Sequence, residues 1–444
     1  MLQKLTEKVN QISPELRKII SNIGWLFTDR LLRMGVGIIV TAWLARYLGT
    51  EQFGLYNFAI AFVTLFHTVA TLGLDQIVVR NIVSDIEHKN TMLGTALTLR
   101  LSSGILLFLS ANLAIFFLRP DDPLTRWVVG IIAGGLIFEA FNTIDLWFQS
   151  QVQSKYTVLA KNIGFILITT VRIILISIEA PLVSFAWAAL AETGIFAISL
   201  TVAYHVSGQK LFDWKFDRDR GKTLLQESWP LILSGLAIMV YLKIDQVMLG
   251  QLADDAAVGI YSGATRISEV WYFVAIAIVN SVNPSILESR KVSESKFYQK
   301  LQKLFNLMAV LAYAIAIPVT FLSRWIVVVI FGAEYAAAGL VLSIHIWAAL
   351  FVFFGWSKGI WIIAESQTLY SLVSTSAGAV LNIVLNFWLI PQYREVGAAI
   401  ATVVSYGFTD YVLCFIYPPA RRLALIMTES ITLTFVVKRL FRRA

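Results

Sequence analysis

The chain has 444 residues, of which 57% are hydrophobic and only 14% are charged, and its formal net charge is +8. An average soluble domain carries roughly 25% charged residues. Together with a mean hydropathy of +0.72, this composition excludes a globular protein with a water-facing surface and indicates an all-α polytopic membrane protein. The single cysteine, Cys414, excludes a disulfide framework.

The first 21 residues are polar enough to precede the membrane. They contain no apolar core of a cleavable signal, but Leu2, Leu5, Val9 and Ile12 recur every three or four residues. This spacing forms one apolar face, interrupted at Pro14. We expect residues 1–21 to form a cytoplasmic amphipathic segment on the membrane surface; a solvated tail is the alternative.

Twelve stretches are long and apolar enough to cross a membrane, which takes about 20 residues. The predicted spans are 22–46, 53–78, 93–118, 124–150, 156–178, 181–207, 224–249, 257–284, 304–322, 337–361, 368–390 and 396–416. The longest connections, 208–223 and 285–303, are polar and too short for a folded domain. We therefore predict an N-terminal lobe of six helices over 22–207, a cytoplasmic linker over 208–223, and a C-terminal lobe of six helices over 224–416.

Basic residues set the predicted orientation. With the N-terminus in the cytoplasm, most of the 36 Lys and Arg residues fall on the cytoplasmic side, and the opposite side holds only Arg46, Arg119, Arg126, Arg324 and Arg394. This distribution fits the positive-inside rule with both termini in the cytoplasm. Lys358 is counted at the border of the cytoplasmic 10–11 loop. Orientation accounts for most of the net charge, so nothing indicates a nucleic-acid partner.

The last segment, 417–444, is a basic tail. Its apolar part, 423–437, is only 15 residues long and contains Glu429. A thirteenth span here would carry the final basic residues to the wrong side of the membrane. We predict an interfacial cytoplasmic helix instead.

An internal repeat relates the two halves. Residues 43–59 resemble residues 248–264, with Gly54 matching Gly259 and Tyr56 matching Tyr261, each pair 205 positions apart. Chance is an alternative, because Gly and Tyr are common at membrane boundaries. An offset of six spans gives both halves the same orientation, and transporters commonly place the substrate site between such halves.

Ionisable residues within the predicted spans are the candidate site, because each is costly in lipid and needs a partner or a wet cavity. Guanidinium groups bind phosphate oxygens in bidentate fashion, so cations facing a common cavity would suit a phosphate-bearing ligand. The candidate substrate-binding residues are Arg30, Arg33, Arg100, Arg172, Lys243 and Arg266. The candidates for ion coupling are Asp29, Glu139 and Asp145. Structural ion pairs are the alternative role for several of these residues.

Catalytic and metal-binding patterns are missing from the sequence. The four histidines share no metal-ligand spacing, and His67 and His345 are expected to be hydrogen-bonded packing residues. We therefore predict neither a catalytic residue nor a metal site. No cofactor is expected beyond a coupling ion, for which H⁺ and Na⁺ are the candidates.

Several segments together resemble one family. Residues 22–62 and 70–82 are similar to the N-terminal signature of Wzx-type polysaccharide and O-antigen flippases. The stretch FGAEYAAAGLVLSI (331–344) resembles their 9–10 loop, and 381–406 resembles their span 11–12 signature. Within the last segment, Arg394-Glu395 replaces a frequent Tyr-Gly.

The resemblance implies a member of the multidrug/oligosaccharidyl-lipid/polysaccharide (MOP) exporter superfamily, with two six-helix lobes around a central cavity that opens alternately to each side. The implied cargo is an undecaprenyl-diphosphate-linked oligosaccharide, flipped from the cytoplasmic to the periplasmic leaflet of a bacterial inner membrane. The implied partners are membrane lipids and other polysaccharide-assembly proteins, including those of lipopolysaccharide synthesis. The alternatives are a drug/cation antiporter of the same superfamily and a membrane polysaccharide polymerase.

Overall fold

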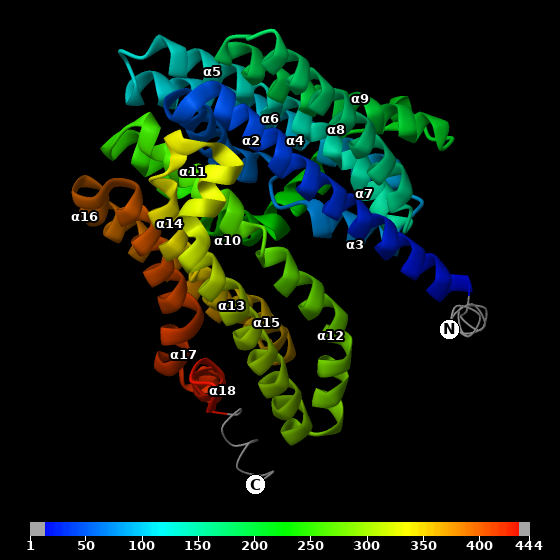
Figure 1. Cartoon of the computed structure of the whole chain (residues 1–444). Helices are drawn as coiled ribbons and strands as arrows, with labels where there is room; N and C mark the ends of the chain where they lie inside the picture. Colours follow the sequence, from blue (N-terminus) through cyan, green and yellow to red (C-terminus); the bar gives the residue numbers. More distant parts are fainter. Residues whose placement is uncertain (1–13, 435–444) are drawn as a thin grey trace, which may run out of the picture. The chain divides into compact units, whose positions relative to one another are not determined.

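The computed structural model describes residues 14–434, with side chains from residue 33 onward. Every regular element in this range is a helix (Figure 1). The part of the predicted amphipathic segment before Pro14, the last ten residues of the basic tail, and the side chains of Asp29 and Arg30 lie outside what is described.

The first half of the chain forms helices that closely follow the predicted spans. They are α2 (Pro14–Ala70), α3 (Asp75–Ser84), α4 (Lys89–Leu118), α5 (Pro123–Ala133), α6 (Gly135–Phe138), the 3₁₀ turn η1 (Glu139–Asn142), α7 (Thr143–Ser150), α8 (Ser154–Ser177), α9 (Leu182–Val206) and the 3₁₀ turn η2 (Leu211–Asp213).

The second half continues in the same manner. It contains α10 (Arg218–Leu252), α11 (Asp255–Glu269), α12 (Tyr272–Val292), α13 (Glu294–Phe331), η3 (Ala333–Tyr335), α14 (Ala338–His345), α15 (Ala348–Ala364), α16 (Thr368–Gly407), the π-helical turn η4 (Phe408–Val412), α17 (Leu413–Ile416), η5 (Pro418–Ala420) and α18 (Arg421–Ile431).

Ten stretches of the described residues are long and apolar enough to cross a membrane. Two of them, Arg33–Ser84 and Thr368–Ile416, have 52 and 49 residues, more than twice what one crossing needs. Each contains a residue with non-helical dihedrals, Gly49 in the first and Arg394 in the second. Both breaks fall between two predicted spans, and the count of twelve crossings stays a prediction.

The segment 285–303 differs from the expected polar loop. It is almost entirely helical, because α12 runs to Val292 and α13 begins at Glu294, with a single non-helical residue, Ser293, between them. The polar side chains that suggested a loop lie on exposed helix faces; Lys300, for example, donates to the Ser285 backbone carbonyl at 2.7 Å.

The structure separates into two compact units. The first unit comprises the residues up to Leu44 together with Phe62–Leu236, and the second comprises Ala45–Ala61 together with the chain from Ala237. Each has its own apolar core, built around Leu93, Ile144 and Phe148 in the first and around Phe305, Phe353 and Trp361 in the second.

Helix α18 belongs to the core of the second unit. Leu423 and Met427 are fully buried, and Gln302 of α13 donates to Ser430 at 3.2 Å. With eleven residues, α18 is too short to cross a membrane, so the described residues contain no thirteenth span.

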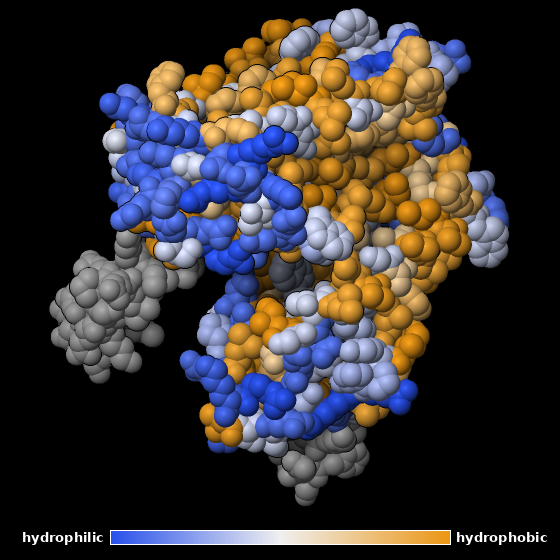
Figure 2. All heavy atoms as spheres, turned by 180° about the vertical axis from the view of Figure 1, so that it is seen from behind, coloured by the Kyte–Doolittle hydropathy of each residue, from blue (hydrophilic) through white to orange (hydrophobic). Residues whose placement is uncertain are grey.

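Large apolar side chains are exposed along many of the long helices. Phe117, Ile166, Phe321 and Trp388 are examples, and Figure 2 shows apolar side chains covering much of one face of the molecule. A water-soluble protein rarely exposes such continuous apolar surface. The exposed surface therefore fits a multi-pass membrane protein whose outer faces contact lipid.

The repeated glycines pack against each other in the second unit. A Cβ on Gly54 would overlap with the Asp255 carbonyl, and a Cβ on Gly259 would overlap with the Thr50 carbonyl. Thr50 and Asp255 are also 205 positions apart, so the two overlaps exchange under the repeat. This reciprocity indicates that the two copies of the motif meet about a local pseudo-twofold axis.

The break at Gly49 is held by the segment 331–335. Gly49 has a φ of 69°, which favours glycine. The Glu334 carboxylate accepts hydrogen bonds from the Thr50 amide at 3.1 Å and its hydroxyl at 3.2 Å, capping the helix that restarts there. Tyr335 donates to the Ala45 and Gly49 carbonyls, both at 3.0 Å. Burial raises the pKa of Tyr335, which keeps its hydroxyl protonated as the donor.

The second break is held by an ion pair. Arg394 has a φ of 50°, a region that favours glycine. Its guanidinium binds Asp254, which also caps α11 by accepting from the Ala257 amide at 2.8 Å. Although partial burial opposes ionisation, Arg394 and the Ala257 amide hold the pKa of Asp254 below its ordinary value. The ion pair thus holds a strained residue at the break.

Candidate substrate and ion sites

The candidate cations of the first unit lie on long apolar helices. Arg33 is on α2, Arg100 on α4 and Arg172 on α8. Neighbouring helices supply carboxylates to Arg100 and Arg172, because an unpaired charge at membrane depth is costly. The sequence predicts these residue types but not their pairing.

Arg172 and Glu192 form the central pair. The Arg172 guanidinium lies 2.7 Å from the Glu192 carboxylate across the α8–α9 contact. Glu192 also lines a cavity of about 230 Å³ together with Arg33 and Lys161. Arg33 stacks on Phe165 of the same cavity, 5.4 Å from the ring centroid. The cavity thus brings cations of two helices, α2 and α8, together with one carboxylate of α9.

Lys161 is a site residue that the sequence analysis missed. It falls within the predicted span 156–178 but is absent from the candidate cations; the structure places it within α8, where it lines the cavity. Its ammonium lies 3.7 Å from Asp145, and Asp145 also accepts from the Thr157 hydroxyl. The spacing of these residues could have indicated a shared site, because Lys161, Gly164 and Phe165 lie on one face of a helix.

Asp145, a predicted ion-coupling residue, therefore binds Lys161 rather than standing alone. We call Arg33, Lys161, Arg172, Asp145 and Glu192 the charge cluster. It contains three cations and two carboxylates, so it keeps a surplus positive charge at a site built from membrane helices.

Arg100 occupies a separate position. Its side chain is only 3% exposed, and it pairs with Asp75 at 2.7 Å. Its Nε has no hydrogen-bond partner among the described residues. Arg100 is buried too deeply to meet a large ligand in this conformation.

Glu139 pairs with His67 rather than with a cation of the candidate set. The two side chains are 3.2 Å apart, and Glu139 also accepts from Asn142. Glu139 begins the 3₁₀ turn η1, which interrupts the helical stretch between α6 and α7. His67 is therefore not the simple packing residue that was expected. His345 is the hydrogen-bonded packing residue that was expected, because it is buried and hydrogen-bonded to Ser268 at 2.7 Å.

The remaining candidates are not brought into the charge cluster by any described contact. Lys243 is half-buried on α10, and Arg266 is exposed on α11, both in the second unit. Asp29 and Arg30 lie on α2 at one and less than one turn before Arg33.

The second unit contains a buried carboxylate without a cationic partner among the described residues. Asp245 is 3% exposed. It accepts hydrogen bonds from Tyr261 at 2.8 Å, from Asn386 at 2.6 Å and from Thr402 at 2.6 Å. Asn386 in turn donates to Asn382 at 3.0 Å. We call these five residues the Asp245 cluster.

Oxygen atoms suitable for a cation converge in the Asp245 cluster. Its side chains offer carboxylate, amide and hydroxyl oxygens, the donors that hard cations prefer. The amide oxygen of Asn386 is buried and has no hydrogen-bond partner. A buried carboxylate among neutral groups is stabilised by a bound cation. The oxygen atoms of the cluster are of the kind that bind Na⁺.

A buried ion pair corrects another assignment. Lys358 was placed at the border of a cytoplasmic loop, but it lies within α15, is 3% exposed, and contacts Asp410 at 2.7 Å. Asp410 lies in the π-helical turn η4, where Gly355 leaves room for its carboxylate. The apolar sequence around Lys358 is a signal of this burial.

Comparison with solved structures identifies the fold. The structure is similar to an inward-facing multidrug resistance MATE family transporter of the MOP superfamily, with a TM-score of 0.72 and 16% identity over 91% of this chain and 98% of the other. It is also similar to "Lipid II flippase MurJ" in an inward closed conformation, with a TM-score of 0.71 and 16% identity over 95% and 93%. The fold is that of MOP-superfamily transporters.

The sequence then gives the family. The profile of the family described as "Polysaccharide biosynthesis protein" matches residues 19–290, and that of "MatE" matches residues 230–388. Because the first match covers more than half of the chain, the chain belongs to the polysaccharide biosynthesis protein family. The family description connects it with polysaccharide biosynthesis, and its fold is that of MOP-superfamily transporters.

Two curated relatives have related names. The chain is 22% identical over 409 residues to a "Probable low-salt glycan biosynthesis flippase" of Haloferax volcanii, covering 86% of this chain and 80% of the relative. It is 21% identical over 393 residues to a "Capsular polysaccharide biosynthesis protein" of Staphylococcus aureus, covering 87% and 96%.

Proposed function

We propose that this protein flips an undecaprenyl-diphosphate-linked oligosaccharide from the cytoplasmic to the periplasmic leaflet of a bacterial inner membrane, and that the charge cluster binds the diphosphate. The supporting observation is the cavity that brings Arg33 and Lys161 to the Arg172–Glu192 pair within apolar helices. O-antigen or another lipopolysaccharide glycan is a cargo of this class.

The chemistry of the charge cluster supports the proposal. Guanidinium and ammonium groups form short, charge-assisted hydrogen bonds to phosphate oxygens. The two carboxylates neutralise part of this charge when no ligand is bound, so the cations remain tolerable at membrane depth. A diphosphate competes with Glu192 for the Arg172 fork, and such binding can be reversed when the cavity changes state.

The driving ion is a second part of the proposal. The Asp245 cluster takes up Na⁺, and occupancy of Asp245 biases the equilibrium between two conformations of the transporter. Support comes from burial of this carboxylate without a described cationic partner, and from the unsatisfied oxygen of Asn386. Asp245 thereby replaces Asp29, Glu139 and Asp145 as the leading residue for ion coupling.

The test of the diphosphate site is a charge exchange. In Arg172→Glu, polysaccharide export should fall at least tenfold, because a charge-assisted hydrogen bond contributes about 1.5–3 kcal/mol. Adding Glu192→Arg restores the ion pair but moves the cation to another helix. We expect export to stay low in the double variant, measured as surface polysaccharide at matched protein levels.

The matched control is the exchange of Arg290 and Glu365, a pair 2.8 Å apart at the ends of α12 and α15. Both of its members lie outside the charge cluster, so the exchanged pair should support normal export. If the Arg172–Glu192 exchange also exports normally, the pair is structural and the diphosphate site is wrong.

A drug/cation antiporter is the competing function. A site for cationic drugs needs surplus negative charge, whereas the charge cluster has one more cation than carboxylates. Resistance to cationic dyes conferred by the wild-type gene, without any effect on polysaccharide export, would favour the antiporter.

A further inference from the structure

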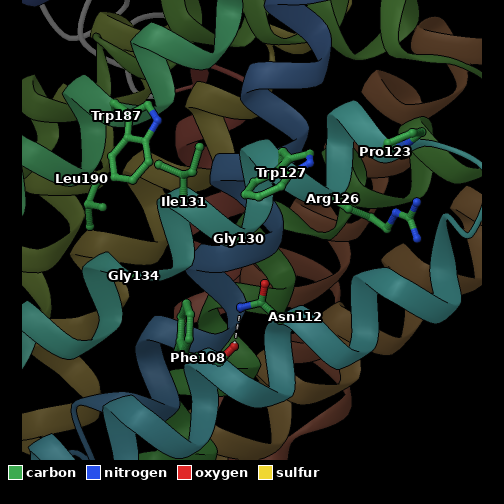
Figure 3. A pocket seen from close by; sticks show the side chains of 10 residues that line it. All are labelled: Phe108, Asn112, Pro123, Arg126, Trp127, Gly130, Ile131, Gly134, Trp187 and Leu190. Carbon is green, nitrogen blue, oxygen red and sulfur yellow. Dashed lines mark hydrogen bonds between the residues drawn. The ribbon is translucent and has the colours of Figure 1, made fainter.

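An open cleft lies on the outer surface of the first unit, between α4, α5 and α9. Its volume is about 550 Å³, within the range of small-molecule sites. Its wall is mainly apolar and aromatic; the lining residues used below are Asn112, Arg126, Trp127, Gly130, Gly134, Trp187 and Leu190 (Figure 3).

Glycines create the floor of this cleft. Arg126, Gly130 and Gly134 follow one another at intervals of four residues, so they lie along one face of α5 and its C-terminal end. The eight helical steps from Arg126 to Gly134 span about 12 Å. The floor of the cleft is therefore an apolar channel that begins at a single cation, Arg126.

The amide nitrogen of Asn112 in the cleft is already hydrogen bonded. It donates to the Phe108 carbonyl at 2.8 Å, as the dashed line in Figure 3 shows. A Cβ on Gly130 would come within 2.8 Å of the Asn112 amide oxygen. Apart from Asn112 and Arg126, the side chains that line the cleft are apolar or aromatic, which suits a hydrocarbon chain.

Arg126 stands at one end of the cleft without a carboxylate partner among the described residues. Its guanidinium stacks on Phe116, 5.5 Å from the ring centroid. The neighbouring cation, Arg119, is engaged by Asp122 at 3.4 Å. Arg126 is therefore the cation available to an anionic ligand at this end.

The two tryptophans give the cleft the character of a membrane interface. Trp127 and Trp187 are 69% and 55% exposed, and indole rings prefer the level of lipid headgroups. In Figure 3 the Trp187 ring lies beside Leu190, and Arg126 lies at the other end of the view. A ligand with an anionic head and an apolar tail matches this arrangement.

The cleft and the charge cluster occupy different faces of α9. Glu192 follows Trp187 by five residues, which turns it by about 140° around the helix. The cleft is lined by Trp187 and Leu190, and the charge-cluster cavity by Glu192, Thr193 and Phe196. A ligand in the cleft is therefore a separate molecule from one bound at the charge cluster.

We propose that this cleft binds one anionic phospholipid, with the phosphate on Arg126 and an acyl chain along Gly130 and Gly134 between the two tryptophans. The occupant is a lipid of the surrounding bilayer, because the cleft is open, apolar and on a lipid-facing surface. Arg126 belongs to the side predicted to be non-cytoplasmic, so the lipid comes from that leaflet.

Native mass spectrometry of the full-length protein tests this proposal. Phosphatidylglycerol and phosphatidylcholine with identical acyl chains are titrated onto the delipidated protein. The wild type should retain one phosphatidylglycerol with a clear preference over phosphatidylcholine. Arg126→Gln should weaken phosphatidylglycerol binding about tenfold, the loss of one charge-assisted contact, and remove the preference.

A second variant tests the channel. Leu190→Trp fills the cleft and should weaken binding of both lipids, because both use the same acyl site. The controls are Leu124→Trp, an exposed position on α5 outside the cleft, and Arg218→Gln, an exposed cation elsewhere in the first unit. Both controls should bind as the wild type does.

Two results would overturn the proposal. One is wild-type lipid binding by both Arg126→Gln and Leu190→Trp. The other is displacement of phosphatidylglycerol by a polyprenyl phosphate at equal concentration, with the same dependence on Arg126, which would assign the cleft to the cargo instead.

Discussion

Single ionisable residues point most directly to function. They fall into three kinds according to what surrounds their side chains. Arg172 and Glu192 meet at the edge of a cavity, Lys358 and Asp410 are buried against each other, and Asp245 is buried among neutral donors. A pair buried away from any cavity is costly to break but serves no ligand. A lone carboxylate in a polar cluster suits a mobile ion better, because taking up the ion removes an unfavourable charge.

Asp245→Asn tests ion binding at the residue scale. The wild-type protein should gain thermal stability from Na⁺ relative to choline. Ligand binding stabilises by about 2.7 kcal/mol at a hundredfold excess over Kd. The variant keeps the shape of the side chain and should lose the response, measured as the melting temperature of the purified protein.

Asp410→Asn is the matched control. It should melt at a lower temperature, because Lys358 is left buried without its partner, yet keep the response to the ion. An unchanged ion response in Asp245→Asn would show that Asp245 is not the ion site.

The residues themselves could be read from the sequence, but their partners could not. Arg33, Arg172 and Glu192 stand out as charges in apolar segments. Pairing depends on how helices rotate against each other, and the amphipathic signal that would fix the rotation is weak when lipid surrounds the bundle. Asp245 lies near the end of the predicted span 224–249, and nothing in the sequence links it to Asn382, Asn386 and Thr402, which lie more than 130 residues away.

The helices and the breaks within them follow largely from the apolar pattern of the sequence. The predicted spans match the helices closely, since the length of an apolar stretch is set by the thickness of the membrane. The two helix breaks, at Gly49 and Arg394, also fall where the sequence predicts connections between spans. What the sequence does not reveal is that Glu334 and Tyr335 fasten the first break, a contact between segments almost 290 residues apart.

Gly54→Ala and Gly259→Ala test the reciprocal helix contact. Each added methyl group would overlap with a backbone carbonyl, and overpacking typically costs about 1–3 kcal/mol. Since the two overlaps are related by the repeat, both variants should lower the melting temperature by similar amounts.

Gly359→Ala is the control for the glycine contact, because a Cβ at Gly359 meets nothing within 4 Å. That variant should be neutral or slightly stabilised by the better helix propensity of alanine. Wild-type melting temperatures in both Gly54→Ala and Gly259→Ala would contradict the close contact and the local pseudo-symmetry.

The whole molecule has an α-helical membrane fold and belongs to the polysaccharide biosynthesis protein family. Composition alone predicts the membrane class. The resemblance in residues 22–62, 70–82, 331–344 and 381–406 predicts a polysaccharide biosynthesis family with the MOP-superfamily fold, and the family and structural matches confirm both. The glycan could not be predicted. Sugar recognition requires specific side chains around a cavity, and nothing in the apolar sequence specifies which sugars they bind.

Translocation by the purified full-length protein in liposomes is the most direct test of the central claim. A polyprenyl-diphosphate-linked oligosaccharide is placed in the outer leaflet, and its loss of accessibility to a membrane-impermeant lectin is followed over time. We predict protein-dependent translocation that slows at least tenfold in Arg172→Glu and is not restored by adding Glu192→Arg. Translocation no faster than in protein-free liposomes, alongside transport of a cationic dye, would contradict the account.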